Sequence, residues 1–382
     1  MKIETIQRNK DVIYDVEDLE HLYTFSKFPV FMGCTTQPIE EDLEVDMRWE
    51  ISKKSGIIQL NPLLPLDILY QASHGSGNIG SMWLEHHQKF AKFIRKQSPK
   101  CVLEIGGLHG ILSREYKKHS VIDWTIIEPN PSPAPGVNAT FIKGFFDEKF
   151  SFGGEVDAIV HSHVFEHVYC PNKFITHISN FLKDGKKVIF SIPRLEEMIK
   201  RKYTNGLNFE HTVFLTEPYV EYLFSRHGFK KIDKQYFCED HSIFYAFEKK
   251  HYVDIEHIPN DLYKYNKKLY LDYISYHELL IKDLNTKIDN INKNGVIYLF
   301  GAHVFSQLLI NFGLNTSRID YILDNDPNKQ GKRLYGTDLM VKSPFILKND
   351  DKPTIILKAG VYNEEIKSDI YENINKKAIF LE

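Results

Sequence analysis

The stretch that decides the fold runs from Cys101 to Tyr116 and reads CVLEIGGLHGILSREY. Its first part is a short apolar run, typical of a buried parallel strand, and its last part has the apolar spacing of a helix. Between them, Gly106, Gly107 and Gly110 permit a tight turn and let a ligand approach the backbone closely. A strand, a glycine-rich turn and a helix in this order predict the first unit of a ligand-binding α/β sheet.

Similar apolar runs follow along the chain. WTIIEP, VDAIVHS and KKVIFSIP each end where polar or glycine residues begin, and helical patterns separate them. This alternation predicts βαβ units and an α/β fold with a doubly wound sheet, which KKIDKQYFCEDHSIFYAFEK closes as an antiparallel hairpin. A second α/β pattern contains GVIYLFGAH, RIDYILDNDP and PTIILKAG, and predicts a small Rossmann-like domain.

These patterns divide the chain into four zones. Residues 1–65 are mixed, with small strand candidates, and residues 66–250 hold the first α/β pattern. Residues 251–292 are charged, carry Tyr, Leu and Ile at helical spacing, and read as a helical linker. Residues 293–382 hold the second α/β pattern. We therefore expect two α/β domains preceded by a small N-terminal domain.

The bulk composition excludes several classes of protein. The chain has 382 residues, 42% of them hydrophobic, and a net charge of −3, so disorder and general affinity for nucleic acid or anionic membranes are not expected. Four scattered cysteines indicate free thiols in a reducing compartment. The N-terminus has no signal-peptide pattern and the chain has no apolar run of about 18 residues. We expect a cytoplasmic protein.

Acidic residues accompany the glycine turn. Glu104 lies two residues before Gly106, and Glu128 ends the second predicted strand, where a carboxylate can accept hydrogen bonds from ribose hydroxyls. The order E-x-G-G-x-x-G, then I-I-E-P, then V-D-A-I-V-H-S-H resembles the successive motifs of class I S-adenosylmethionine-dependent methyltransferases. The resemblance implies their Rossmann-like doubly wound fold and S-adenosylmethionine as cofactor.

The resemblance extends beyond these motifs. The stretch IIQLNPLLPLDILYQASHGSGNIGSMWLEHHQKFAKFI, together with GAHVFSQ and DNDPNKQGKRLYGT, is similar to three-domain bacterial sugar C-methyltransferases that act on nucleotide-linked deoxysugars. Their N-terminal domain binds zinc through two C-x-x-C pairs. Here Ser52 and Ser55 stand at the place of one pair, and Cys34 stands alone. Serine is a poor zinc ligand, so residues 1–65 are expected to form a zinc-ribbon-like domain without metal, held by apolar side chains including Phe28, Phe31, Trp49 and Ile57.

The family likeness also implies which residues bind the cofactor. The candidates come from the loop before the first large helix and from the ends of the first, second and fourth strands. They are Tyr70, Ser76, Gly77, Glu104, Gly106, Gly107, Gly110, Glu128, Pro129, His161 and Ser162.

The tripeptide Phe-Glu-His occurs twice, at 165–167 and at 209–211, after the fourth and fifth strands. The second copy resembles the Y-x-E-H-x-x-Y motif of the sugar C-methyltransferases, whose histidine is the proposed base. Asn208 and Phe214 replace the two tyrosines, which leaves C- and O-methylation open. We expect His211 to act as general base with Glu210 beside it, because a histidine pKa lies near working pH. His163, His167 and Asn208 are the predicted substrate contacts.

Other interpretations follow from the same residues. His161, His163 and His167 could together bind a divalent ion, but no carboxylate cluster follows the fourth strand, so no metal is expected. A non-catalytic descendant that binds nucleotide sugars or partners, and a nicotinamide oxidoreductase, are the alternatives to a methyltransferase. The favoured function is methylation of a nucleotide-linked or otherwise activated sugar in surface-polysaccharide or secondary-metabolite synthesis. The expected partner is that small molecule, with neither nucleic acid nor membrane.

Overall fold

The computed structural model of the chain describes residues 3–71, 80–292 and 295–382. Its largest sheet has seven strands in the order β10-β11-β9-β8-β5-β6-β7. From β5 to β9 the strands are parallel, and β11 and β10 add an antiparallel hairpin. The strands are β5 (Cys101–Ile105), β6 (Asp123–Glu128), β7 (Thr140–Lys143), β8 (Ala158–Ser162), β9 (Lys187–Pro193), β10 (Phe229–Phe237) and β11 (Ser242–Lys249). The doubly wound sheet and its closing hairpin are thus confirmed, and β7 is an addition to the predicted strands.

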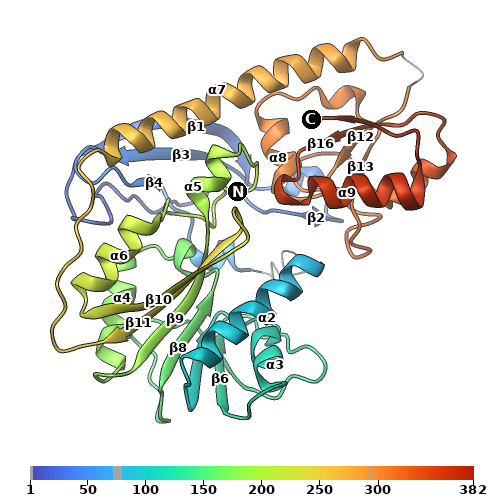
Figure 1. The fold of residues 1–382 in the computed structure, drawn as a ribbon. Coiled ribbons are helices and arrows are strands. Elements are labelled where there is room, and N and C mark those ends of the chain that lie inside the picture. The colour runs from blue at the N-terminus through green and yellow to red at the C-terminus, as the bar shows by residue number, and fades with distance from the viewer. Residues whose placement is uncertain (1–2, 72–79, 293–294) are drawn as a thin grey trace.

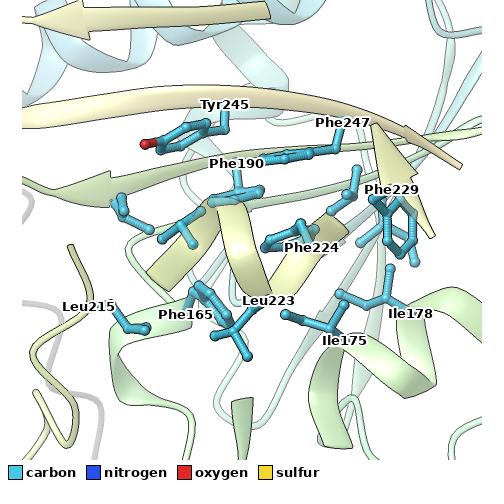
Figure 2. Packing of buried hydrophobic residues seen from close by; sticks show 14 of the residues in the cluster. Phe165, Ile175, Ile178, Phe190, Leu215, Leu223, Phe224, Phe229, Tyr245 and Phe247 are labelled. Carbon is cyan, nitrogen blue, oxygen red and sulfur yellow. The ribbon is translucent and has the colours of Figure 1, made fainter. Parts of the chain in front are cut away.

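Helices cover both faces of this sheet (Figure 1). Helices α2 (Ser81–Lys96) and α3 (Ile111–Lys117) pack on one face, and α4 (Pro171–Phe181) and α6 (Glu217–Arg226) pack on the other. Because side chains alternate along a strand, Leu103 joins the α4–α6 core while Val102 joins the α2–α3 core. Figure 2 shows the first of these cores, in which the Phe224 ring stacks on Phe190 and Phe247 with ring centroids 4.8 and 4.6 Å apart.

A second sheet forms the C-terminal part of the chain. It has five parallel strands in the order β15-β13-β12-β16-β17. They are β12 (Ile297–Phe300), β13 (Tyr321–Leu323), β15 (Val341–Lys342), β16 (Thr354–Leu357) and β17 (Ile379–Leu381), and helices α8 (Val304–Asn311) and α9 (Asn363–Asp369) accompany them. The three apolar runs of the second predicted α/β pattern are β12, β13 and β16. Within this sheet, the pattern missed β15 and β17, the two short edge strands.

The N-terminal residues form a small antiparallel sheet of β1 (Leu19–Pro29), β3 (Glu44–Ser52) and β4 (Ile58–Leu60). Phe28 and Trp49 are buried in a core that this sheet shares with α5 (Leu195–Lys200), with α8 and with α7 (Leu262–Asp289). A short ladder joins β2 (Cys34–Thr35) to β14 (Arg333–Leu334), beside a two-pronged Arg333–Asp42 ion pair with N–O distances of 2.6 and 2.7 Å. The N-terminal segment therefore contacts both α5, which follows β9 of the large sheet, and elements of the C-terminal part of the chain.

Hydrogen bonds surround the serines that stand where the resembling family has cysteine ligands. Ser52 Oγ donates to Asp18 Oδ2 at 3.2 Å and accepts from the Ser55 amide at 3.0 Å. Ser55 Oγ donates to Asp11. Ser55 Oγ also accepts from the Ile57 amide at 3.2 Å, so each hydroxyl both donates and accepts in closing the β3–β4 turn.

Helix α7 runs along the N-terminal sheet toward the C-terminal sheet (Figure 1). Its first half buries Tyr270, Tyr273 and Ile274 against the N-terminal sheet, and its second half buries Leu284 and Ile288 in the C-terminal core. At 1.5 Å per residue, its 28 residues span about 42 Å. Within residues 251–292, predicted as a helical linker, residues Leu262–Asp289 thus form one continuous helix. Within the described ranges, no helix combines the length and apolarity that crossing a membrane requires.

Candidate active site

A cavity of about 1280 Å³ lies at the carboxyl ends of β5, β6 and β8 and extends to residues of the C-terminal sheet. Open α/β sheets bind ligands at this edge, where loops and helix N-termini meet. Pockets for a single small ligand are usually about 300–1,000 Å³. This cavity therefore has room for a cofactor and a second molecule.

The glycine turn after β5 forms one wall of the cavity. Gly106 has φ +73°, and a Cβ atom there would lie 2.7 Å from the Val164 side chain. A Cβ atom on Gly107 would lie 2.8 Å from the carboxyl carbon of Glu104. Both positions therefore exclude larger residues, and the bare backbone remains available to a ligand.

Two buried carboxyl groups support this turn. Glu128, at the end of β6, accepts hydrogen bonds from the Leu108 amide at 3.1 Å and from the Asn130 amide at 2.9 Å. Each of its oxygens keeps a lone pair for a ribose hydroxyl. Glu104 accepts from the Trp124 indole at 2.6 Å, and burial raises its pKa to about 7. Glu128 therefore suits ribose binding, whereas Glu104 is buried behind the glycine turn, next to Gly107.

The first Phe-Glu-His copy forms a single 3-10 turn after β8. Phe165 is buried in the core of the large sheet, and Glu166 is fully buried with no hydrogen bond to its carboxylate oxygens among the described residues. Its nearest partners are His163 Nδ1 at 3.5 Å and His167 Nε2 at 3.8 Å. Burial, with a smaller effect of the Glu210 charge, raises the Glu166 pKa to about 8. Glu166 is therefore a neutral carboxylic acid at pH 7.

The second copy lies in a loop fixed by Asn208. The Asn208 Oδ1 accepts from the amides of Glu210 and His211 at 2.8 and 2.9 Å. The ring of His211 bonds through Nδ1 to the Gly206 carbonyl at 3.0 Å. Burial lowers the His211 pKa, while the bond to Gly206 opposes this effect. Asn208, predicted to contact substrate, thus uses its amide oxygen to shape the loop.

The two copies meet at the cavity. The rings of His167 and His211 are 5.3 Å apart, and His167 Nδ1 lies 3.7 Å from Glu210 Oε2 and 3.3 Å from the Tyr70 hydroxyl. Burial raises the Tyr70 pKa well above its usual value. The predicted residues that line the cavity are Tyr70, Glu104, Gly106, Gly107, Glu128, Pro129, Ser162, His163, His167, Asn208, Glu210 and His211.

Two predicted cofactor contacts lie elsewhere and require correction. His161 faces the α4 side of the sheet, where its ring stacks on Phe190 at 4.7 Å, because it alternates with the cavity-lining Ser162. Gly110 is not a lining residue; a Cβ atom there would lie 2.6 Å from the Val137 side chain, so it serves packing. Ser76 and Gly77 lie outside the described residues.

Sequence reasoning missed the other wall of the cavity. His87 and Trp83 come from α2, and His241 comes from the turn between β10 and β11. His303 and Tyr362 come from the segments that follow β12 and β16 of the C-terminal sheet. The paired histidines of HHQ in α2 were a visible signal, but the C-terminal wall depends on packing between distant segments.

Comparison with protein families identifies two regions. Residues 82–234 match the model described as methyltransferase domain, and residues 263–381 match the model described as C-methyltransferase C-terminal domain. No curated protein matches the chain.

Solved structures similar to the chain are also methyltransferases. An S-adenosylmethionine-dependent methyltransferase from Mesorhizobium loti is 12% identical, covers 44% of this chain and 100% of its own, and has a TM-score of 0.36. Magnesium protoporphyrin IX methyltransferase from Synechocystis, solved with S-adenosylhomocysteine, is 14% identical, covers 46% of this chain and 91% of its own, and has the same TM-score.

The sheet order, the glycine turn with Glu128, and the methyltransferase-domain match define an S-adenosylmethionine-dependent methyltransferase of the class I fold. A methyltransferase is thus supported over the non-catalytic descendant and the nicotinamide oxidoreductase, the two alternatives that the sequence left open. More particularly, the protein carries the C-terminal domain of C-methyltransferases. S-adenosylmethionine is its cofactor, and the bare backbone at Gly106 and Gly107, beside the hydrogen-bonded Glu128 carboxylate, fits that molecule.

Proposed function

We propose that the protein methylates a sugar, nucleotide-linked or otherwise activated, at carbon or oxygen. The reaction would serve surface-polysaccharide or secondary-metabolite synthesis in the cytoplasm. His211 is the general base in this proposal, and Glu210 orients its surroundings or binds a sugar hydroxyl. The C-terminal family match favours carbon as the methylated atom.

The observation that carries the proposal is the hydrogen bond between His211 Nδ1 and the Gly206 carbonyl. A carbonyl oxygen only accepts, so Nδ1 holds the hydrogen and Nε2 keeps a lone pair. Burial lowers the pKa of His211 and so favours the neutral ring. A neutral, oriented imidazole at a cavity wall is the form that removes a proton from an acceptor.

The remaining residues of the site orient the reactants. S-adenosylmethionine supplies an activated methyl group, so the protein must align the acceptor, exclude water and take up one proton. The Asn208 bonds hold the loop of the base, and the Tyr70 hydroxyl lies at the His167 ring. His167 and His163 are the proposed acceptor contacts beside the base.

The C-terminal sheet offers residues for the rest of the acceptor. Gly301 and residues 324–326 line the cavity there, as does Lys329, whose Nζ lies 3.0 Å from Asp324 Oδ2. Lys329 is the one lysine or arginine among the described lining residues. If the acceptor has a phosphate, this ammonium group is its proposed partner.

The test uses the full-length protein, labelled S-adenosylmethionine and a panel of nucleotide-linked keto- and hydroxysugars beside non-sugar acceptors. We expect label transfer to a sugar and none to the non-sugar set, with the labelled atom assigned by NMR. Transfer only to non-sugar acceptors would refute the substrate class. Calorimetry with S-adenosylhomocysteine tests the cofactor site independently of the acceptor.

A further inference from the structure

Three imidazole rings from distant segments meet beside the cavity. His86 lies on α2, His163 follows β8, and His241 lies in the turn between β10 and β11. Their ring centroids are separated by 5.4 Å for His86–His163, 5.5 Å for His86–His241 and 5.9 Å for His163–His241. One ring nitrogen from each lies within 4.8 Å of the other two.

These separations are close to those of a three-histidine metal centre. Zinc binds imidazole nitrogen at about 2.0–2.1 Å, which puts each ring centroid about 3.2 Å from the ion. Tetrahedral geometry then separates the centroids by about 5.2 Å. The three observed separations are about 0.2–0.7 Å larger, so binding one ion requires the three rings to move closer together and to turn one nitrogen each toward it.

The surroundings of the rings are those of a metal centre. Ligating histidines usually bond through their second nitrogen to an orienting group. Here His86 Nε2 bonds to Ser191 Oγ at 2.9 Å, and the Ser242 hydroxyl contacts His163 Nε2 at 2.9 Å and His241 Nδ1 at 2.6 Å. The ligand nitrogen of His163 is then Nδ1, which would have to turn from Glu166 Oε1, 3.5 Å away. His86 Nδ1 is buried without a hydrogen-bond partner among the described residues. This nitrogen is therefore available to bind an ion.

Aromatic side chains enclose the same cluster. The Trp83 ring lies 5.2 Å from His86, 5.0 Å from His163 and 5.0 Å from His241, centroid to centroid. Phe237 and Phe244 also pack on His86, with ring centroids 5.3 and 5.2 Å away. An apolar shell limits the access of water to the ring nitrogens, as around many metal centres.

We propose that His86, His163 and His241 bind one divalent ion of the zinc class. Three imidazoles leave one position of a tetrahedron open. Since His163 and His241 line the cavity, that position is available to water or to an oxygen atom of the acceptor. With the ion bound, His163 contacts the acceptor through the ion and not directly. The site depends neither on the proposed sugar nor on His211 as base.

This proposal differs from the metal interpretation considered for the sequence. That interpretation grouped His161, His163 and His167 by their spacing along the chain, but the ring of His161 is in the core. A second group, Glu166, His167 and His211, also has ligand atoms within 4.8 Å of one another. We favour the three-histidine cluster because its serine hydroxyls and aromatic shell already orient and enclose the rings.

Cobalt titration of the full-length, chelator-treated protein tests the site, because tetrahedral Co²⁺ has an intense visible absorption. We expect one Co²⁺ per chain, displaced by one Zn²⁺. His86→Ala and His241→Gln should each weaken binding by at least about 100-fold. His119→Ala, on an exposed histidine, and His211→Ala should leave binding unchanged.

The outcomes separate the possibilities. No stoichiometric binding, or unchanged binding in His241→Gln, overturns the proposal. Loss of binding in His211→Ala with retention in His241→Gln moves the ion to the Glu166 group and also overturns it. His86 and His241 are both buried. If His86→Ala fails to melt cooperatively, His241→Gln, which keeps a polar side chain of similar size, decides the test alone.

Discussion

The two Phe-Glu-His copies are identical in letters and opposite in environment. Phe165 anchors the first copy in the core of the large sheet, and Phe209 anchors the second in the core shared with the N-terminal sheet. Glu166 is fully buried, whereas the Glu210 side chain is 12% exposed and faces His167. The comparison teaches that the backbone conformation around a motif decides the chemistry of its side chains. The 3-10 turn buries the Glu166 carboxyl group, whereas the loop held by Asn208 exposes the Glu210 carboxyl group to the cavity.

The largest expected effect separates the two histidines. His211→Ala should lower turnover by about 10²–10⁴, because loss of a positioned base typically has that effect. His167→Ala should instead raise the acceptor KM, with a smaller loss of turnover. Steady-state kinetics with S-adenosylhomocysteine calorimetry as a binding control measure both. Loss of turnover in His167→Ala with near wild-type His211→Ala would reverse the assigned roles.

A substitution at Glu128, which lies outside both Phe-Glu-His copies, tests whether cofactor binding is separate from the role of the two copies in turnover. Glu128→Ala should weaken S-adenosylhomocysteine binding at least about tenfold, because a charged acceptor contributes about 1.5–3 kcal/mol. Turnover at saturating cofactor should stay near that of the wild type. Calorimetry gives the affinity, with Glu155→Ala as an exposed control. An unchanged affinity would remove Glu128 from the cofactor site.

Asn208 offers a smaller effect confined to the second copy. Asn208→Ala removes the acceptor of two amide hydrogen bonds, and a lost cap of this kind typically costs about 1 kcal/mol. We expect a roughly fivefold fall in kcat with cofactor affinity retained. Asn208→Asp keeps the acceptor oxygen and should recover most of the activity. Equal losses in both variants would indicate a direct contact of the Asn208 amide nitrogen with substrate.

The smallest effect concerns stability and the first copy. The Glu166 pKa is about 8 in the folded protein and near its ordinary value when unfolded, so the unfolded chain loses this proton first. The contribution of neutral Glu166 to the free energy of unfolding has its full value below about pH 4 and is lost as the pH rises to about 8. Glu166→Gln cannot ionise, so its Tm should exceed that of the wild type by a few degrees at pH 8. The difference should shrink at pH 5, as measured by calorimetry. A difference independent of pH would show that Glu166 does not titrate.

Much of the fold was predictable from sequence because its strands are continuous apolar runs ended by glycine or polar residues. The ends of β5 and β6 also predicted the glycine turn and Glu128 beside each other, since parallel strands end at one edge. The orientation of His161 was not predicted, because one residue along a strand reverses the face and the apolar run did not fix its register. The role of Asn208 in the loop depends on backbone geometry. The cavity wall that contains Trp83 and Tyr362 depends on packing between segments that are remote in the sequence.

The length of α7 has a consequence for the cavity. One helix presents an apolar stripe to each of two cores, so the angle between those stripes is set by the number of residues between them. Each inserted residue would turn one stripe by about 100° against the other and lengthen the helix by 1.5 Å. The number of residues in α7 therefore fixes how the C-terminal part of the cavity wall is rotated relative to the N-terminal sheet. Substitutions of solvent-exposed residues on α7 would leave this rotation unchanged, whereas single-residue insertions or deletions would misalign the two halves of the cavity.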